Sequence, residues 1–267
     1  MRGKWLTGLA MGLALTTVAD AKPRLHYSRH SATNPAMQSA AAVAAAVADP
    51  ARSADNLKLD ASRKPAEVLN FLGLKPGMQV ADMFGVNHYW AEIFAPAVGP
   101  KGHVTVWEPE QFYSDKSKAE FATFAAGKAN VSIISSPFAA PNLPAKSFDF
   151  MLINLDYHDV YWQSAKYGIT RMEPDVWLKT LFAAMKPGGI VGVVDHIANP
   201  GETRATVEKL HRIDPATVRA DYERAGFVFD GESDVLRNPA DDHSLLVFDA
   251  AIRGKTDRFI YRFKKPR

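Results

Sequence analysis

The stretch QVADMFGVNHYWAEIFAPAVGPKGHVTVWEP, residues 79–109, decides the fold of this chain. An apolar run ends at Asp82, a glycine follows at Gly85, and after a helical segment a second apolar run ends at Glu108. In a strand–helix–strand unit of this kind, the turn after the first strand and the acid at the tip of the second face the same crevice, where nucleotide-like ligands bind. The sequence therefore predicts that Gly85 and Glu108 line a ligand site.

Outward from this unit, apolar segments and helical segments alternate along the chain. This alternation predicts an α/β fold with a doubly wound, Rossmann-like, mostly parallel seven-stranded sheet and an antiparallel last strand, preceded by an N-terminal helical extension. Because residues 253–256 are too few for a crossover, the last two predicted strands are expected to form an antiparallel pair. The predicted strands are residues 79–84, 103–107, 131–134, 148–153, 190–194, 227–229, 244–249 and 258–263, and the main predicted helices are 62–72, 89–98, 174–185 and 214–225.

The first 54 residues predict a leader and a helical extension. Arg2 and Lys4 precede an uncharged, mostly apolar run at residues 5–18, and residues 19–21 form a small-x-small cleavage site. This pattern is typical of a secretory signal peptide. We therefore expect a signal peptide at residues 1–21, a linker and alanine-rich helix at 22–54, and the main domain at 55–267. We also expect the protein to be exported to the periplasm and not to stay inserted in the membrane after the signal peptide is cleaved.

The composition removes several classes of function. The 267 residues carry a formal net charge of +3 and include no cysteine. A charge this small gives no argument for binding nucleic acid. The absence of cysteine excludes disulfides, cysteine-ligated zinc and a thiol nucleophile. We expect the partner to be a small molecule and no nucleic acid, and the composition leaves the oligomeric state open.

Several motifs carry a resemblance to a known family. The segments VADMFG and VTVWEP, and the KPGG turn before residues 190–194, resemble class I S-adenosylmethionine-dependent methyltransferases. The segments GVNHYWAEIFAPAVGPKG, HRIDPATVRADYERAGF and TDRFIYRFKKP are most similar to a bacterial group of exported predicted methyltransferases. The resemblance covers residues 57–263. It implies S-adenosylmethionine as the cofactor and methyl transfer to a small molecule as the activity.

The resemblance also implies where the cofactor binds. Asp82 is expected beneath its amino-acid end, and Glu108 is expected to accept hydrogen bonds from both ribose hydroxyls, since a carboxylate is an acceptor with two oxygens. Gly85 lets the backbone approach a ligand closely because it has no side chain. The remaining cofactor-binding candidates are His88, Ser136 and Asn154.

The glycine turn departs from the family pattern. Val86, Asn87 and His88 stand where this family usually has glycines or small residues. Their side chains would crowd the methionine part of the cofactor. An alternative prediction is therefore an exported binding protein that keeps the methyltransferase-like fold and does not methylate.

The ends of the strands at 148–153 and 190–194 supply the catalytic candidates, because both ends lie at the carboxyl edge of the sheet. His158 is the predicted general base, since imidazole titrates near neutral pH. Asp156 and Tyr157 are the other catalytic candidates. Tyr157, Tyr161 and Trp162 predict an aromatic wall for the substrate or for the positively charged sulfur.

The same region leaves a metal-dependent enzyme open as an alternative, although no metal is the prediction. Asp156 and Asp195 match the acids that hold magnesium in the similar catechol-type O-methyltransferases, while His196 replaces an asparagine. Because magnesium prefers oxygen ligands, the histidine favours manganese, iron or zinc over magnesium.

Two other groups of polar residues complete the candidates. His211 and Arg212 either reach the mouth of the crevice or form a structural salt bridge. Asp241, Asp242 and His243 are expected to lie in a solvated loop.

Overall fold

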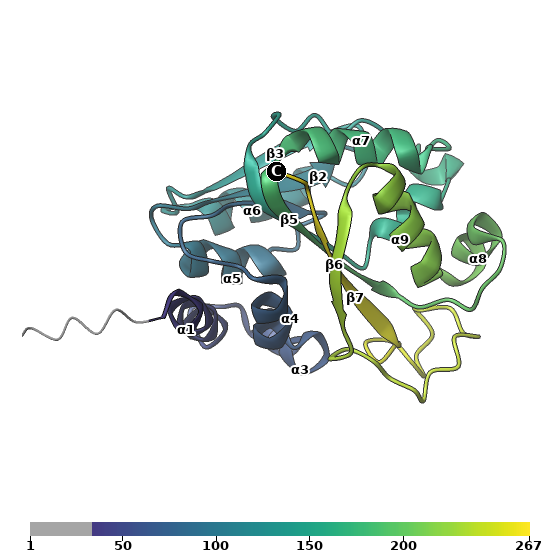
Figure 1. The fold of residues 1–267 in the computed structure, drawn as a ribbon, viewed down its shortest axis with the longest axis horizontal. Helices are drawn as coiled ribbons and strands as arrows, with labels where there is room; N and C mark the ends of the chain where they lie inside the picture. Colours follow the sequence, from purple (N-terminus) through teal and green to yellow (C-terminus); the bar gives the residue numbers. More distant parts are fainter. Residues whose placement is uncertain (1–33) are drawn as a thin grey trace, which may run out of the picture. The chain divides into compact units, whose positions relative to one another are not determined.

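A single mixed sheet organises the molecule (Figure 1). The computed structural model describes residues 34–267, so the predicted signal peptide at 1–21 lies outside the described residues. The strand order is β3-β2-β1-β4-β5-β7-β6. The strands are β1 Gln79–Met83, β2 His103–Pro109, β3 Val131–Ser136, β4 Phe148–Asn154, β5 Met185–His196, β6 Val228–Ser233 and β7 Arg258–Lys264.

The predicted fold class is confirmed by the strand directions. β1, β2, β3, β4 and β5 are parallel neighbours, whereas β7 is antiparallel to both β5 and β6. The parallel strands are buried on both faces, and buried strands of this kind are continuous apolar runs. The carboxyl ends of β1, β2, β4 and β5 therefore meet at one edge of the sheet.

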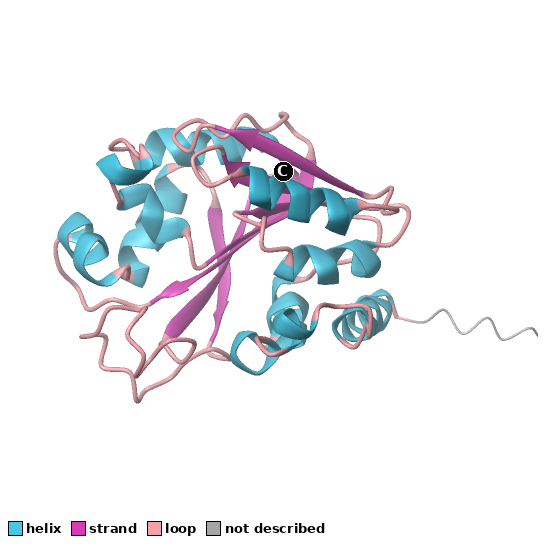
Figure 2. Cartoon of the chain, turned by 180° about the vertical axis from the view of Figure 1, so that it is seen from behind, coloured by secondary structure: helices cyan, strands magenta, loops and turns pink. Residues whose placement is uncertain are grey.

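Helices cover both faces of the sheet (Figure 2). One face buries an apolar core with α1, α4, α5 and α6, and the other buries a core with α7 and α9. The helices are α1 Pro35–Val47, α2 Ala54–Leu57, α3 Asp60–Arg63, α4 Pro65–Leu72, α5 Tyr89–Val98, α6 Asp115–Ala125, α7 Pro174–Ala184, α8 Thr203–Leu210 and α9 Pro215–Arg224, with short 3-10 turns η1 Tyr157–Tyr161 and η2 Ala165–Tyr167. In the part of the chain that the structure describes, no helix has the length and hydropathy needed to cross a bilayer.

The helix predicted at residues 62–72 is broken in two. Lys64 has a left-handed φ of 43° and separates α3 from α4. The residue before a proline disfavours the helical region, and Pro65 begins α4. The break turns the end of α3, including Arg63, toward the carboxyl edge of the sheet, where Arg63 lines a small cavity.

An ion-pair network joins the segment before β1 to the start of α5. The guanidinium of Arg52 donates to both carboxylate oxygens of Asp60, at 2.7 and 2.8 Å. The Tyr89 hydroxyl donates to the same carboxylate at 2.8 Å. A bidentate Arg–carboxylate pair fixes geometry more strictly than a single hydrogen bond. The network therefore positions α3 against the first turn of α5.

The predicted strand at residues 244–249 is wrong. Those residues lie in a long loop, 234–257, and the antiparallel neighbours of β7 are β5 and β6. An apolar run with a short following turn suggested a hairpin, but the backbone of the loop is held by side chains instead. The Arg212 Nε donates to the carbonyl of Leu245 at 2.9 Å.

A buried ion pair anchors this loop. Arg212 is fully buried, and its Nη1 lies 2.9 Å from Asp241 Oδ2. Asp241 is only 5% exposed and also accepts the backbone N–H of Asp257 at 2.7 Å. The expectation that Asp241 belongs to a solvated loop is therefore wrong, and Arg212 forms the structural salt bridge.

Candidate functional site

Two buried carboxyl groups lie at the carboxyl ends of β1 and β2. Asp82 is 1% exposed, and its Oδ2 is buried without a hydrogen-bond partner among the described residues. Burial and the charge of Glu108 raise the pKa of Asp82 to about 8. Glu108 accepts the Val86 N–H at 3.2 Å, and burial raises its pKa to about 7. A buried acceptor that lacks a partner indicates a place for a ligand that donates hydrogen bonds or carries positive charge.

The position of the Asp82 carboxylate leaves no room for a side chain at residue 85, which is Gly85. A Cβ at Gly85 would lie 2.5 Å from Asp82 Oδ2, so any side chain would force the turn open. Phe84 and His88 have left-handed φ values of 58° and 63°. Residues other than glycine adopt this conformation at a cost of about 1–2 kcal/mol each. The turn thus keeps a backbone suited to glycine while carrying side chains, and such strain is concentrated at functional sites.

The side chains of this turn point in different directions. The Phe84 ring packs edge-on against Trp107 and Phe138, with centroid distances of 5.0 and 5.2 Å. The His88 ring stacks on Phe124 of α6 at 4.7 Å, so His88 does not line the crevice as predicted. Phe84 therefore closes the end of the crevice beside β2.

A small cavity of about 110 Å³ lies between β1, β4 and α3. Two predicted residues, Asn154 and Asp156, line it, and so does Asn87 from the glycine turn. The full lining is Arg63, Met83, Phe84, Asn87, Trp90, Asn154, Leu155 and Asp156. The structure therefore brings Asn154 and Asp156 together with residues that precede β1.

The cavity combines hydrogen-bond donors with acids. The Arg63 guanidinium lies over the Tyr89 ring at 4.1 Å and has no hydrogen bond or ion pair with the rest of residues 34–267. Burial lowers the pKa of Arg63, while the charges of Tyr89, Asp156 and Asp82 oppose this shift. Trp90 Nε1 is buried without a partner in the same described range. Burial and the charge of Asp159 raise the pKa of Asp156 well above its usual value.

Arg63 and Trp90 were not predicted from the sequence. Each lies outside the loops that usually carry ligand groups, one at the end of a short helix and one inside α5. The Lys64-Pro65 dipeptide is the signal that could have indicated Arg63, because it predicts a chain break at that point.

His158 is a buried cation between acids. Its Nδ1 lies 2.8 Å from Asp195 Oδ1, its backbone N–H donates to Asp195 Oδ2 at 2.9 Å, and its Nε2 lies 3.5 Å from Asp159 Oδ1. Burial lowers its pKa, but the charges of Asp195 and Asp159 outweigh burial and raise the pKa to about 9. A histidine that is protonated at neutral pH does not accept a proton, so the predicted role of His158 as general base is not supported.

Tyr157 and Tyr161 are held by one carboxylate in the core. Their hydroxyls donate to Asp221 Oδ2 at 2.7 and 2.5 Å, and Tyr157 is fully buried. The Tyr157 hydroxyl therefore points away from the crevice, which contradicts its predicted catalytic role and its place in an aromatic wall.

Ser136 is buried in a structural contact. Its Oγ accepts from Trp107 Nε1 at 2.8 Å and from the Asn142 N–H at 3.1 Å. Both lone pairs are filled, so only the hydroxyl hydrogen remains for a ligand. Ser136 therefore helps to fix the loop after β3. The predicted contact with the cofactor base could use only the hydroxyl hydrogen of Ser136.

The residues of the metal alternative are occupied by protein groups. His196 Nδ1 lies 2.7 Å from Thr256 Oγ1, and Asp195 is bonded to His158 and to the His196 N–H. Within residues 34–267, no group of three or more His, Asp or Glu side chains has a metal-binding arrangement. The arrangement of Asp156, Asp195 and His196 therefore gives the metal alternative no support.

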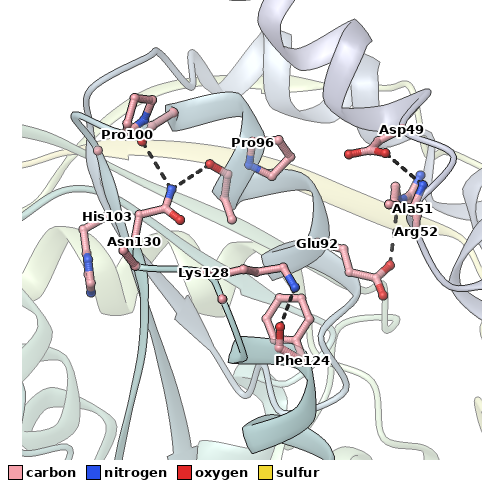
Figure 3. Close-up of a pocket in the computed structure, with 15 residues that line it drawn as sticks. Asp49, Ala51, Arg52, Glu92, Pro96, Pro100, His103, Phe124, Lys128 and Asn130 are labelled. Atoms are coloured by element: carbon pink, nitrogen blue, oxygen red, sulfur yellow. Dashed lines mark hydrogen bonds and ion pairs between the residues drawn. The ribbon is translucent and has the colours of Figure 1, made fainter.

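Another hollow lies at the opposite edge of the sheet (Figure 3). It has a volume of about 690 Å³ and is bordered by the ends of α5 and α6, near the starts of β2 and β3. Asn130 Nδ2 donates there to the carbonyls of Ala95 and Gly99, which completes the end of α5. Lys128 donates to the Phe124 carbonyl and lies over the Phe124 ring. These contacts complete helix ends, and Arg52 and Glu92 in the same hollow pair with each other at 3.9 Å. We therefore place the candidate site at the carboxyl edge, where buried polar groups lack partners.

Known proteins resemble this chain in structure. No family model matches the sequence, and no curated protein matches it. A SAM dependent methyltransferase from Aquifex aeolicus matches with a TM-score of 0.54 at 19% identity, over 86% of this chain and 98% of that chain.

Two further solved structures match this chain, one named as an N-methyltransferase and the other as a cyclase. The 1,6-didemethyltoxoflavin-N1-methyltransferase of Burkholderia thailandensis, with bound 1,6-didemethyltoxoflavin and S-adenosylhomocysteine, matches with a TM-score of 0.52 at 14% identity, over 88% and 91% of the two chains. The [4+2]-cyclase SpnF matches with a TM-score of 0.52 at 17% identity, over 77% and 82%. The chain therefore shares the α/β fold of S-adenosylmethionine-dependent methyltransferases.

Proposed function

We propose that this protein binds S-adenosylmethionine at the carboxyl edge and catalyses methyl transfer to a small molecule. The observation that supports this most is a set of groups at one small cavity: the unpartnered donors of Arg63 and Trp90 line it together with the buried Asp156. The charge of the buried Asp82 also acts on Arg63. The amino-acid end of S-adenosylmethionine carries a carboxylate and an ammonium group. The donors complement the carboxylate, and the acids complement the ammonium group. When bound, the cofactor supplies a methyl group on a positively charged sulfur.

Each residue has a distinct task in this proposal. Arg63 and the Trp90 N–H donate to the carboxylate of the ligand, while Asp82 and Asp156 accept from its ammonium group. Glu108, at the end of β2, accepts from ribose hydroxyls. Because the pKa of Asp82 is about 8 and that of Glu108 about 7, both acids lose protons when a cation binds. Affinity for a cationic ligand is therefore expected to rise as the pH rises from 6 to 8.

Replacing Glu108 with glutamine is expected to weaken S-adenosylmethionine binding about 10- to 100-fold, because hydrogen bonds to a charged group contribute about 1.5–3 kcal/mol. Isothermal titration calorimetry of the full chain measures the change. The exposed neighbour Glu110 provides a matched control, and Glu110→Gln should bind like the wild type. The proposal is wrong if the wild type gives no binding heat, or if Glu108→Gln and wild type bind equally well.

One observation favours a second candidate, a ligand-binding protein that does not methylate. The cavity of about 110 Å³ is smaller than the usual ligand pocket of about 300–1,000 Å³. Phe84 fills space beside it, with 9% of its surface exposed. The name of the SpnF structure, a cyclase, also indicates that this fold supports chemistry other than methylation.

Phe84→Gly separates the two candidates. Glycine removes the ring and suits the left-handed backbone, so the crevice gains the volume of a phenyl ring. If the wild type does not methylate, Phe84→Gly is expected to raise S-adenosylmethionine affinity tenfold or more, which corresponds to about 1.4 kcal/mol. Calorimetry makes the comparison, with Phe84→Leu as a control that keeps the space filled. Measurable wild-type affinity that Phe84→Gly leaves unchanged argues against the second candidate.

A further inference from the structure

Two neighbouring histidines at the carboxyl edge have opposite surroundings. His158 has both ring nitrogens facing acids, at 2.8 and 3.5 Å. His211 lies beside it, with ring centroids 5.6 Å apart, and its Nδ1 is buried without a partner among residues 34–267. A pair of titratable groups with opposed environments is a common arrangement for acid–base chemistry.

The position of His211 is fixed by the backbone. It ends α8 with a left-handed φ of 51°, and its N–H donates to the Val207 carbonyl at 2.9 Å. A residue other than glycine adopts this conformation only where surrounding structure holds it. The ring is therefore presented at a defined place next to His158.

Aromatic rings surround His211 on its outer side. Its centroid lies 5.4 Å from that of Trp162 and 5.2 Å from that of Phe248. Tyr167 continues the row, 5.8 Å from Trp162. Phe248 is 57% exposed and Tyr167 is 44% exposed, so the row of rings reaches the surface. Exposed aromatic side chains grouped beside a polar site indicate a binding surface for a flat apolar group.

We propose that His211 accepts the proton of a hydroxyl group on an aromatic substrate that packs against Trp162 and Phe248. This inference rests on the proposed function, because the hydroxyl oxygen would be the atom that receives the methyl group. The O–H bond breaks with its electron pair left on oxygen, and the proton forms an N–H bond on the imidazole. The charge of the His158 ring, whose centroid lies 5.6 Å from that of His211, stabilises the resulting aryl oxide.

The titration of His211 agrees with this geometry. Burial lowers its pKa, and the charge of His158 lowers it further, while the charges of Glu208 and Asp195 act in the opposite direction. His211 is therefore unprotonated at neutral pH and can accept a proton. His158 remains protonated, so the two rings have complementary roles.

4-Nitrophenol tests the inference, because its ionised form absorbs at a longer wavelength than its neutral form. Wild-type protein is expected to bind the probe and to lower the pH at which it ionises by about one unit, a tenfold change in the ionisation constant. His211→Phe keeps the ring contacts, so it should bind the probe without lowering that pH. His211→Asn, which tolerates a left-handed backbone, is a second variant in case the first does not fold.

The controls separate this inference from the proposed function. His103→Phe, at the opposite edge of the sheet, should ionise the probe like the wild type. The inference would be overturned if the wild type showed no saturable binding of the probe. It would also be overturned if both His211 variants lowered the ionisation pH of the bound probe as much as the wild type does. The probe is added without S-adenosylmethionine, so failure to bind the cofactor in calorimetry contradicts only the proposed function.

Discussion

Arg212→Met is expected to lower the free energy of unfolding by about 3–5 kcal/mol, because it leaves the buried Asp241 carboxylate without its cation. The two side chains are 0% and 1% exposed, so water does not replace the lost partner. The variant also loses hydrogen bonds from the guanidinium to the carbonyls of Leu245 and Ile197. Urea denaturation followed by circular dichroism measures the loss.

A second arginine supplies the control for this prediction. Arg219 pairs with Glu223 on the surface of α9, with side chains 50% and 46% exposed. An exposed pair at this spacing contributes about 0.3–0.5 kcal/mol, so Arg219→Met should change stability little. The double variant Arg212→Met/Asp241→Leu should regain part of the loss, because it removes the unpaired charge. Equal losses for Arg212→Met and Arg219→Met would show that the buried pair is not what holds the loop.

Asp195→Asn is expected to reduce the pH dependence of stability that comes from His158, because Asp195 contributes most to the raised pKa of that ring. In the folded protein the pKa of His158 is about 9, against 6.5 for an ordinary histidine, a difference that corresponds to about 3 kcal/mol. Because the folded value is raised, this stabilisation is present below pH 6.5 and is lost as the pH rises through 9. Without the Asp195 charge the His158 pKa falls, and the loss of stability as the pH rises becomes smaller.

Urea denaturation at several pH values between 6 and 9.5 tests this, together with an NMR titration of the His158 ring. Because the pKa values of Asp82 and Glu108 are also raised, these acids too lower the stability of the fold as the pH rises. The wild type and Asp195→Asn share this contribution. The comparison of wild type with Asp195→Asn therefore isolates His158. Asp55→Asn, an exposed acid, should retain the wild-type profile. A His158 signal that titrates near 6.5 in the wild type would contradict the prediction.

The parallel part of the fold could be predicted from sequence because its signals are local. The predicted helix at residues 89–98 coincides with α5, and the predicted β1, β2, β3 and β4 differ from the observed strands by at most two residues. Buried parallel strands are continuous apolar runs with turns between them, so each can be recognised without its neighbours. Asp82 and Glu108 were placed by the same rule, as acids at the ends of those runs.

The rest of the site depends on contacts between distant residues. His158 and Asp195 are 37 positions apart, and their contact contributes most to the raised pKa of the imidazole. Tyr157 and Asp221 are 64 positions apart, so the burial of that hydroxyl could not be foreseen. The loop at 244–249 was mistaken for a strand because its anchor, Arg212, belongs to a different segment. Each of these errors concerns a side chain whose partner lies beyond the reach of a local pattern.

The loop between β6 and β7 combines buried anchoring contacts with exposed apolar side chains. It leaves and re-enters the sheet at two neighbouring strands, and Arg212 holds it from outside the loop. The side chains it presents, Leu245, Leu246 and Phe248, are exposed and carry none of this anchoring through their own side chains. A replacement loop that keeps these anchors, together with the buried Leu236 and Val247 and the Arg237–Asp257 pair, can therefore carry other side chains at its exposed positions. The exposed positions of this loop are thereby separate from the contacts that keep the loop in place.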